Sequence, residues 1–316
     1  MRRGPAGVAM VAAAAAGWGT WSWFLYRAGL PARISNVIVF AVMGLAALPL
    51  ALRERVGVSG VRGPLGDGAP GVPVAIALDA GAERSRLRLR FDGWDRTAVL
   101  LLGANAICDV LNSLFYFEAI GHTSVAIAVI THYAAPILIA LAAPYIDRVE
   151  TRGARPAAAI ALTGLVIVLE PWHSKVDGAL LGAVFGFTSA VFYAANVFVV
   201  RRLATRIGTL RAISYHSLIG AAITLPLALP YVANVTAPAL GWLAAGAILL
   251  GVGSNTLFIG GLQRIGAGRT AVLTFAEPLV AVPIGVLVLG QPIGPIAAVG
   301  GALVLAAGIH VARQAR

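Results

Sequence analysis

The segment GRTAVLTFAEPLVAVPIGVLVLGQ, residues 268–291, is apolar and long enough to span a bilayer, yet it carries Glu277 and Pro278 near its middle. A carboxylate at bilayer depth costs at least about 2.5–3.5 kcal/mol on insertion, so it normally faces a cavity or a partner. Pro278 and Pro283 each remove a backbone donor that lipid cannot replace. We therefore expect helix breaks at these prolines and Glu277 on a cavity wall; a protonated, purely structural Glu277 is the alternative.

The composition of the whole chain is that of a polytopic membrane protein. Of its 316 residues, 59% are hydrophobic and only 12% are charged, which leaves too little polar sequence to cover a soluble domain. The net charge of +11 does not indicate a nucleic-acid partner, because the arginines lie between apolar segments and form no basic face with interleaved aromatics. The single cysteine, Cys108, excludes an internal disulfide and a multi-cysteine metal site.

Ten apolar segments are long enough to cross a membrane, so we expect an all-α fold with ten transmembrane helices. The first begins with Arg2 and Arg3, as a signal peptide does, but no polar cleavage region follows it, and we expect it to remain as the first helix. The expected spans are residues 1–26, 34–52, 97–118, 122–146, 156–170, 178–200, 211–231, 238–262, 268–290 and 292–312.

Positive charge is distributed unevenly between the connections of these spans. Of the 24 lysine and arginine residues, all except Arg27, Arg33 and Lys175 fall in the termini and in the connections on one side. Lysine and arginine are retained on the cytoplasmic side of a membrane. Both the N terminus and the C terminus are therefore expected in the cytoplasm.

Short matching sequences occur in the same order in the two halves of the chain, which indicates an internal repeat. The matches are LPLAL at 48–52 and 225–229, NSLF at 112–115 and NTLF at 255–258, Pro136 and Pro278, and Gly164 and Gly300. We expect two repeats, residues 1–170 and 178–316, with the extra residues of the first in a cytoplasmic loop insertion at 53–96. Each repeat holds five spans, an odd number, so the second is inverted relative to the first.

Polar residues form a stripe along the third predicted span. Asn105, Asp109, Asn112 and Tyr116 stand at i, i+4, i+7 and i+11, which places them on one face of a helix. Such a face must look into the helix bundle, where it either lines a cavity or joins helices by hydrogen bonds. The repeat matches Asn255 to Asn112, and we expect both at the same cavity.

Imidazole and aromatic side chains complete the candidate site. His132 and Tyr133 precede Pro136 in the fourth span, and a membrane histidine is either a hydrogen-bonded interior residue or part of a proton relay. Trp18 and Trp21 on the first span either bind a flat or cationic ligand or anchor the helix at the membrane interface.

Several polar residues near span ends are expected to be wetted rather than functional: Glu118, Glu170 and His216. The chain lacks the GxxxxGK[ST] loop of ATPases and the HExxH and GxSxG signatures of hydrolases. We therefore expect no ATP hydrolysis, no metal, no cofactor and no enzymatic activity.

The chain resembles EamA-type members of the drug/metabolite transporter superfamily over nearly its whole length. The resemblance rests on the EP-to-LGQ stretch at 276–291, on GWGTW at 17–21, and on two inverted five-helix halves with a glycine-bearing last helix. Gln291 stands where the family commonly has an acidic residue, and the 53–96 loop is longer than usual. The resemblance implies a multi-pass secondary transporter of the bacterial inner membrane that exports amino acids, related metabolites or toxic small molecules.

We expect a secondary active transporter, a proton-coupled exporter of a small metabolite or drug-like molecule, that works by alternating access. Glu277 or Asp109 would exchange a proton or pair with a cationic group on the substrate. Its partners would be that small molecule, protons and membrane lipid; the sequence leaves the oligomeric state open and is compatible with a monomer. The alternatives are a lipid-handling protein or membrane enzyme that uses the same cavity, or a non-transporting sensor that uses the 53–96 loop for docking.

Overall fold

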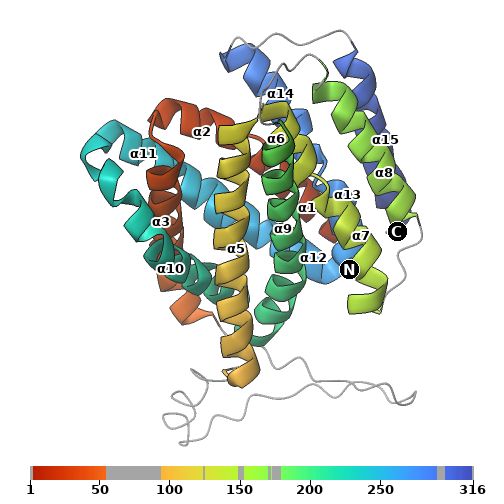
Figure 1. Ribbon diagram of the computed structural model, residues 1–316. Helices are drawn as coiled ribbons and strands as arrows, with labels where there is room; N and C mark the ends of the chain where they lie inside the picture. The colour runs from red at the N-terminus through yellow and green to blue at the C-terminus, as the bar shows by residue number, and fades with distance from the viewer. Residues whose placement is uncertain are drawn as a thin grey trace, which may run out of the picture.

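The computed structural model describes residues 3–54, 94–123, 125–148, 153–169, 172, 179–289 and 296–314, and every regular element in these ranges is helical (Figure 1). The first half contains α1 (Arg3–Trp18), α2 (Trp21–Ala28), α3 (Ala32–Arg53), α5 (Arg96–His122), α6 (Val125–His132), α7 (Ala135–Ile146) and α8 (Ala154–Leu169). The second half contains α9 (Ala179–Ile207), α10 (Thr209–Ala228), the 3-10 helix η2 (Leu229–Asn234), α11 (Ala237–Gly246), the π-helix η3 (Ala247–Ser254), α12 (Asn255–Ile265), α13 (Ala267–Leu273), α14 (Ala276–Leu289) and α15 (Ala297–Gln314). Most of the predicted 53–96 loop lies outside the described residues.

Within the described residues, seven helical segments are long and apolar enough to cross a membrane, and α8 and α15 contain two shorter apolar stretches. The seven are Gly4–Ala28, Ala32–Arg53, Arg96–Ala119, Ile127–Ile146, Leu180–Ile207, Thr209–Asn234 and Ala237–Ile265. Leucines on the outside are strongly exposed, Leu180 to 80% and Leu287 to 84%. Such a surface is covered by lipid rather than water. The chain is a polytopic membrane protein, and each of the seven segments overlaps a predicted span; the count of ten stays a prediction.

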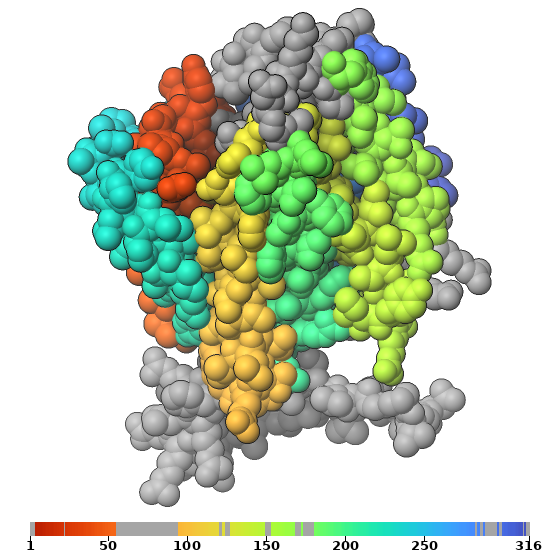
Figure 2. Space-filling model, viewed as in Figure 1, coloured from red at the N-terminus to blue at the C-terminus, as the bar shows by residue number. Residues whose placement is uncertain are grey.

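Helices from the two halves of the chain pack against each other in pairs. α3 lies along α10, α8 along α15, α5 along α9, and α1 along α12. Figure 2 shows α5 and α9 side by side on one face of the molecule. The largest cluster of buried side chains draws on both halves, with Phe40 and Ile139 from the first and Leu203 and Leu262 from the second. The hydrophobic core is thus shared between the halves.

The α8–α15 pair is held together by a close approach of two backbones. A Cβ atom on Gly164 would lie 2.6 Å from the Gly300 carbonyl oxygen, so only glycine fits the present spacing. Small residues at such crossings let membrane helices come close enough for extensive van der Waals contact. Gly164 and Gly300 are also the glycines that the sequence matched between the two halves.

Charged contacts join several helix ends on one side of the bundle. Asp147, at the end of α7, pairs with Arg201 of α9, and Asp95, before α5, pairs with Arg206 at 2.9 Å. Glu54, after α3, accepts hydrogen bonds from the backbone at the start of α10. The ends of these helices therefore lie together, as the predicted alternation of spans requires. The cytoplasmic orientation of this side stays a prediction.

Two helix breaks come shortly before a proline, one inside the segment Ile127–Ile146 and one between α13 and α14. The α6–α7 break precedes Pro136 and the α13–α14 break precedes Pro278, because a proline cannot donate to the carbonyl four residues earlier and clashes with it. At these breaks the amides of Ala134 and Glu277 donate to the carbonyl three residues earlier, at 3.2 and 3.0 Å. Pro283 differs from the prediction of a break, since α14 continues through it to its end. Membrane helices tolerate an interior proline when local adjustments satisfy the freed carbonyl.

Two further irregular segments have their own local causes. Between α1 and α2 the Thr20 hydroxyl donates to the Gly17 carbonyl at 2.7 Å, which offers the backbone a turn in place of the helix. The π-helix η3 ends directly before Asn255, whose side-chain amide donates to the Gly251 carbonyl at 2.7 Å. Single π-helical turns inside a longer helix often occur at functional sites.

Candidate functional site

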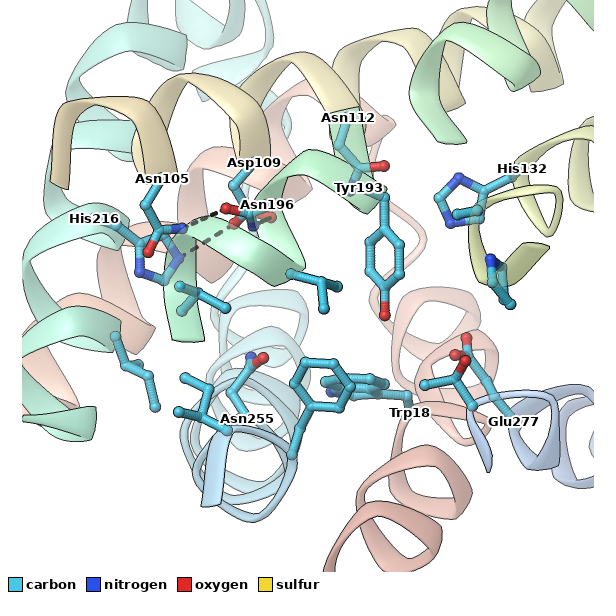
Figure 3. Close-up of a pocket in the computed structure, with 18 of the residues that line it drawn as sticks. Trp18, Asn105, Asp109, Asn112, His132, Tyr193, Asn196, His216, Asn255 and Glu277 are labelled. Carbon is cyan, nitrogen blue, oxygen red and sulfur yellow. Dashed lines mark hydrogen bonds and ion pairs between the residues drawn. The ribbon is translucent and has the colours of Figure 1, made fainter. Parts of the chain in front are cut away.

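A cavity of about 290 Å³ lies between the two halves, next to the irregular segments of the helices (Figure 3). Its wall comes from α1, α2, α5, α6, α7, α9, α10, α12 and α14 and the turns before α7 and α14. Every predicted binding residue except Tyr116 lines it: Trp18, Trp21, Asn105, Asp109, Asn112, His132, Tyr133, Asn255 and Glu277. Of the predicted helix-breaking prolines, Pro136 is part of the wall.

Tyr116, the last residue of the predicted stripe, lies behind the cavity wall. Its ring packs on His132, with the ring centroids 4.7 Å apart. The helical spacing placed Tyr116 on the same face of α5 as Asp109 and Asn112, but its ring contacts His132, a lining residue, and is not itself part of the described lining. Tyr116 therefore supports His132.

At one end of the cavity, Asp109 is the centre of a hydrogen-bonded network that joins α5, α9 and α10 (Figure 3). Its Oδ2 atom lies 3.2 Å from His216 Nε2. Its Oδ1 atom accepts from Asn196 Nδ2 at 3.4 Å, and Asn196 Oδ1 accepts from Asn105 Nδ2 at 2.8 Å. This series of hydrogen bonds leaves the Asn105 Oδ1 atom buried without a hydrogen-bond partner.

The hydrogen bonds of His216 determine where its protons lie. Nδ1 is 2.7 Å from the Ala212 carbonyl oxygen, and a carbonyl only accepts, so Nδ1 carries a hydrogen. Nε2 then faces the Asp109 carboxylate, and two lone pairs at 3.2 Å would repel. A second hydrogen therefore lies between His216 and Asp109, carried either by an imidazolium or by a protonated carboxyl.

His216 corrects a prediction made from the sequence. Its place near a span end predicted a wetted residue at the mouth, yet the side chain is buried, with 5% of the residue exposed. The reason is that α10 packs against both α3 and α5, and this packing turns His216 inward to Asp109. By contrast, Glu118 is about half exposed and pairs with Arg33 at 3.3 Å, as expected of a mouth residue; Glu170 lies outside the described residues.

At the other end of the cavity, Glu277 lies in the first turn of α14. Figure 3 shows it with His132 and Tyr193 on the side of the cavity away from His216. The Tyr133 side chain lies near the Glu277 carboxylate on the cavity wall. A tyrosine hydroxyl donates a hydrogen bond to an ionised carboxylate and accepts one from a protonated carboxyl. Either protonation state of Glu277 thus has a partner.

A second hydrogen-bond chain fixes His132. The Ser189 hydroxyl has one hydrogen, which it donates to Asn112, at 2.8 Å from Oδ1 and 2.9 Å from the backbone oxygen. It therefore accepts from His132 Nδ1, 2.9 Å away. This places the Nδ1 hydrogen on the serine side and leaves Nε2 as the other polar atom of the ring.

Three polar residues of α9 were missed in the sequence, although a signal was present. Ser189, Tyr193 and Asn196 stand at i, i+4 and i+7, the spacing that identified Asn105, Asp109 and Asn112 on α5. Because α5 and α9 pack along each other, the two stripes meet and bond to one another. Tyr193 and Asn196 line the cavity, and Ser189 is fully buried behind it.

The charged side chains of the cavity are acidic. Asp109 and Glu277 lie at its two ends, and the described lining residues include no lysine or arginine. The apolar part of the wall includes Trp18 and Phe258, whose rings pack with their centroids 4.9 Å apart. A ligand here meets hydrogen-bond acceptors at both ends and aromatic surface between them.

Known proteins resemble this chain in sequence and in fold. Residues 180–312 match the EamA-like transporter family. An uncharacterized transporter of Archaeoglobus fulgidus is 31% identical over 67% of this chain and 74% of its own. The uncharacterized transporter YcbK of Bacillus subtilis is 28% identical over 63% of this chain and 67% of its own. A protein crystal structure superposes with a TM-score of 0.73 at 18% identity, covering 98% of this chain and 97% of that one, which supports the fold alone.

The membrane helices, the polar cavity between them and the transporter relatives together define a multi-pass membrane transporter. More specifically, the chain belongs to the EamA-like transporter family.

Proposed function

We propose that the protein is a secondary active transporter that exports a small metabolite, such as an amino acid or a related compound, or a drug-like molecule in exchange for protons. The observation that carries this proposal is the position of Glu277, on the wall of an interior cavity at a helix break. A carboxylate among membrane helices is expensive to keep and is retained for ion or substrate binding. The bacterial inner membrane, with both termini in the cytoplasm, is the proposed location.

Alternating access follows from the proposed arrangement of ten spans in two inverted halves. The helix contacts support it, because they have the form expected of two units related by a two-fold axis. The first span of one half packs on the third of the other in both directions, α1 on α12 and α9 on α5. Rocking of one half against the other would open the cavity to each side of the membrane in turn.

Proton coupling is assigned to Glu277. Its charge can be neutralised by a proton or by a positive group of the substrate, and a site that holds one at a time exchanges one for the other. The described lining residues at this end of the cavity include Tyr133 from the α6–α7 turn, Tyr193 from α9 and His132 from α6. None of these is a lysine or an arginine, whose permanent positive charge would keep the carboxylate ionised.

The test uses purified protein in two stages. A panel of amino acids, polyamines, aromatic cations and neutral metabolites is first screened for thermal stabilisation, since a ligand at 100 times its Kd adds about 2.7 kcal/mol to the folded state. The stabilising compound is then followed into proteoliposomes under an imposed pH gradient. We expect gradient-driven uptake in the wild type and in Glu118→Gln, a control at the mouth, but not in Glu277→Gln. Undiminished gradient-driven uptake by Glu277→Gln would refute the coupling role.

A further inference from the structure

The Asp109 end of the cavity holds a second ionisable pair that the role of Glu277 leaves unused. We infer that the Asp109–His216 pair binds the ammonium group of an amine substrate and releases its own shared proton in exchange. The inference rests on the proposed function and names the substrate class of the same cavity.

Asp109 and His216 share one proton. Because His216 Nδ1 is committed to the Ala212 carbonyl, one further hydrogen lies between Nε2 and Asp109 Oδ2. When an ammonium group donates to the carboxylate in its place, Asp109 is ionised, His216 is neutral with the Ser217 hydroxyl 3.4 Å from its Nε2, and the proton that the pair had shared leaves to the open side of the membrane. One positive charge enters and one leaves, so the net charge of the cavity does not change.

The hydrogen-bonded network around Asp109 also contains an acceptor without a partner, the Asn105 Oδ1 atom. Asn105 lines the cavity and is 1% exposed, and its Oδ1 atom has no hydrogen-bond partner, whereas its Nδ2 is used by Asn196. A buried acceptor without a partner destabilises the protein, and a ligand donor can supply the missing hydrogen bond. An ammonium group has three donors and no acceptor, and it therefore suits a site made of a carboxylate and an amide oxygen.

Among the described residues, the elements packed on α10 place one charged group, Asp109 of α5, against His216. The other groups there are neutral: Asn196 of α9, Asn255 of α12, Ser217 of α10 itself with its hydroxyl 3.4 Å from Nε2, and Phe40 of α3 with its ring centroid 6.4 Å from that of His216. On α10 itself, the buried Arg211 donates to backbone carbonyls at the end of α3 and of α9.

The remainder of the cavity sets the size and character of the amine. Its volume of about 290 Å³ is at the lower limit of ligand pockets, so the ligand is small. Trp18 and Phe258 offer aromatic surface, which packs on an apolar or aromatic body and also attracts cations. A small monoamine with an apolar body, or a short diamine that reaches both carboxylates, fits these features.

The experiment measures binding and proton release together in detergent, where no gradient is needed. Isothermal titration calorimetry of purified protein at neutral pH is run in two buffers of different ionisation enthalpy, with phenethylamine and cadaverine as probes and phenethyl alcohol as the neutral match of phenethylamine. For the wild type we expect at least one of the two amines to bind, with about one proton released per amine molecule bound. If phenethylamine binds, phenethyl alcohol should bind at least about tenfold more weakly.

Matched variants assign the effect to the pair. Asp109→Asn keeps the geometry, since its amide accepts from Asn196 and donates to neutral His216, and we expect amine affinity to fall at least about tenfold. His216→Gln keeps a donor for Asp109 and should bind the amine without releasing a proton. Glu118→Gln, whose carboxylate lies at the mouth, should match the wild type in both readouts.

Three results would overturn the inference. They are failure of both amines to bind the wild type, equal binding of phenethyl alcohol and phenethylamine, and unchanged proton release in Asp109→Asn. If Glu277→Gln released no proton although Asp109 is intact, the released proton would come from Glu277 and not from Asp109, and the inference would also be overturned. Proton-driven transport of a compound without an amine would refute this inference and leave the proposed function standing. The absence of any gradient-driven transport would refute the proposed function, and the calorimetry would still show whether the Asp109–His216 pair binds an amine.

Discussion

The crossing of α8 and α15 permits a test in which a single methyl group is the perturbation. Replacing Gly164 by alanine places a Cβ atom 2.6 Å from the Gly300 carbonyl oxygen and 3.0 Å from the Leu303 Cβ and Val304 Cγ2 atoms. The nearest of these is backbone and cannot rotate away, so the helices must separate by several tenths of an ångström. Inserting a methyl group into a close-packed contact typically costs about 1–3 kcal/mol.

Gly308→Ala is the matched control, because Gly308 lies in the middle part of α15 and a Cβ atom there meets nothing within 4 Å. Both substitutions gain the same helix propensity, about 0.8–1.0 kcal/mol, so their difference isolates the overpacking. We expect Gly164→Ala to be less stable than Gly308→Ala by about 1–3 kcal/mol. The assay is reversible unfolding in mixed micelles with increasing dodecyl sulfate. Equal free energies of unfolding for the two variants would show that the helices do not cross here as described.

Three further substitutions test other parts of the structure. Glu54→Ala removes a carboxylate that accepts from the backbone amides of Thr209 and Arg211 at 2.9 and 3.0 Å. It should lower the free energy of unfolding by about 3 kcal/mol in the same assay, whereas Glu118→Ala should lower it by less than about 1 kcal/mol. A smaller loss in Glu54→Ala than in Glu118→Ala would contradict the capping role. Ser189→Ala leaves His132 Nδ1 and the Asn112 side chain without their partner and should destabilise the protein by about 1–3 kcal/mol. The adjacent, partly exposed Thr188→Ala should change stability by less than about 0.5 kcal/mol. Similar unfolding midpoints for the two variants would argue against this chain of hydrogen bonds. Gly19→Val would place a Cβ atom 2.6 Å from the Glu277 carbonyl oxygen and 2.7 Å from the Val280 Cβ, and we expect loss of proteoliposome uptake with the protein still inserted. Wild-type uptake would show that the turn between α1 and α2 does not lie against α14 at this point.

Much of the candidate site could be read from local patterns. A helix has a fixed period, so Asn105, Asp109 and Asn112 had to share one face, and lipid excludes that face. Proline acts on its own helix, which is why the breaks before Pro136 and Pro278 follow from the sequence. Pro283 lies in the same helix without breaking it, because the outcome there depends on whether neighbouring groups satisfy the freed carbonyl.

Other residues of the site required the packing of distant segments. His216 is the one histidine among several polar residues of α10, and its contact with Asp109 depends on how α10 packs on α5. Tyr116 shows the converse, since its face was predicted correctly but its ring contacts His132 from another helix and is not part of the described lining. Ser189, Tyr193 and Asn196 had a readable spacing, and their partners on α5 became evident only from the α5–α9 contact.

By itself, the sequence determined that the chain is a membrane protein, which faces of its helices are polar, and that helices break near Pro136 and Pro278, because hydropathy, helical period and the missing proline amide are properties of single segments. The tertiary structure alone decided which polar faces meet, that Asp109 and Glu277 lie at opposite ends of one cavity, and that Asp109 has a histidine partner. Those features depend on contacts between residues far apart in the chain, and van der Waals packing and hydrogen bonds select them only after the helices assemble.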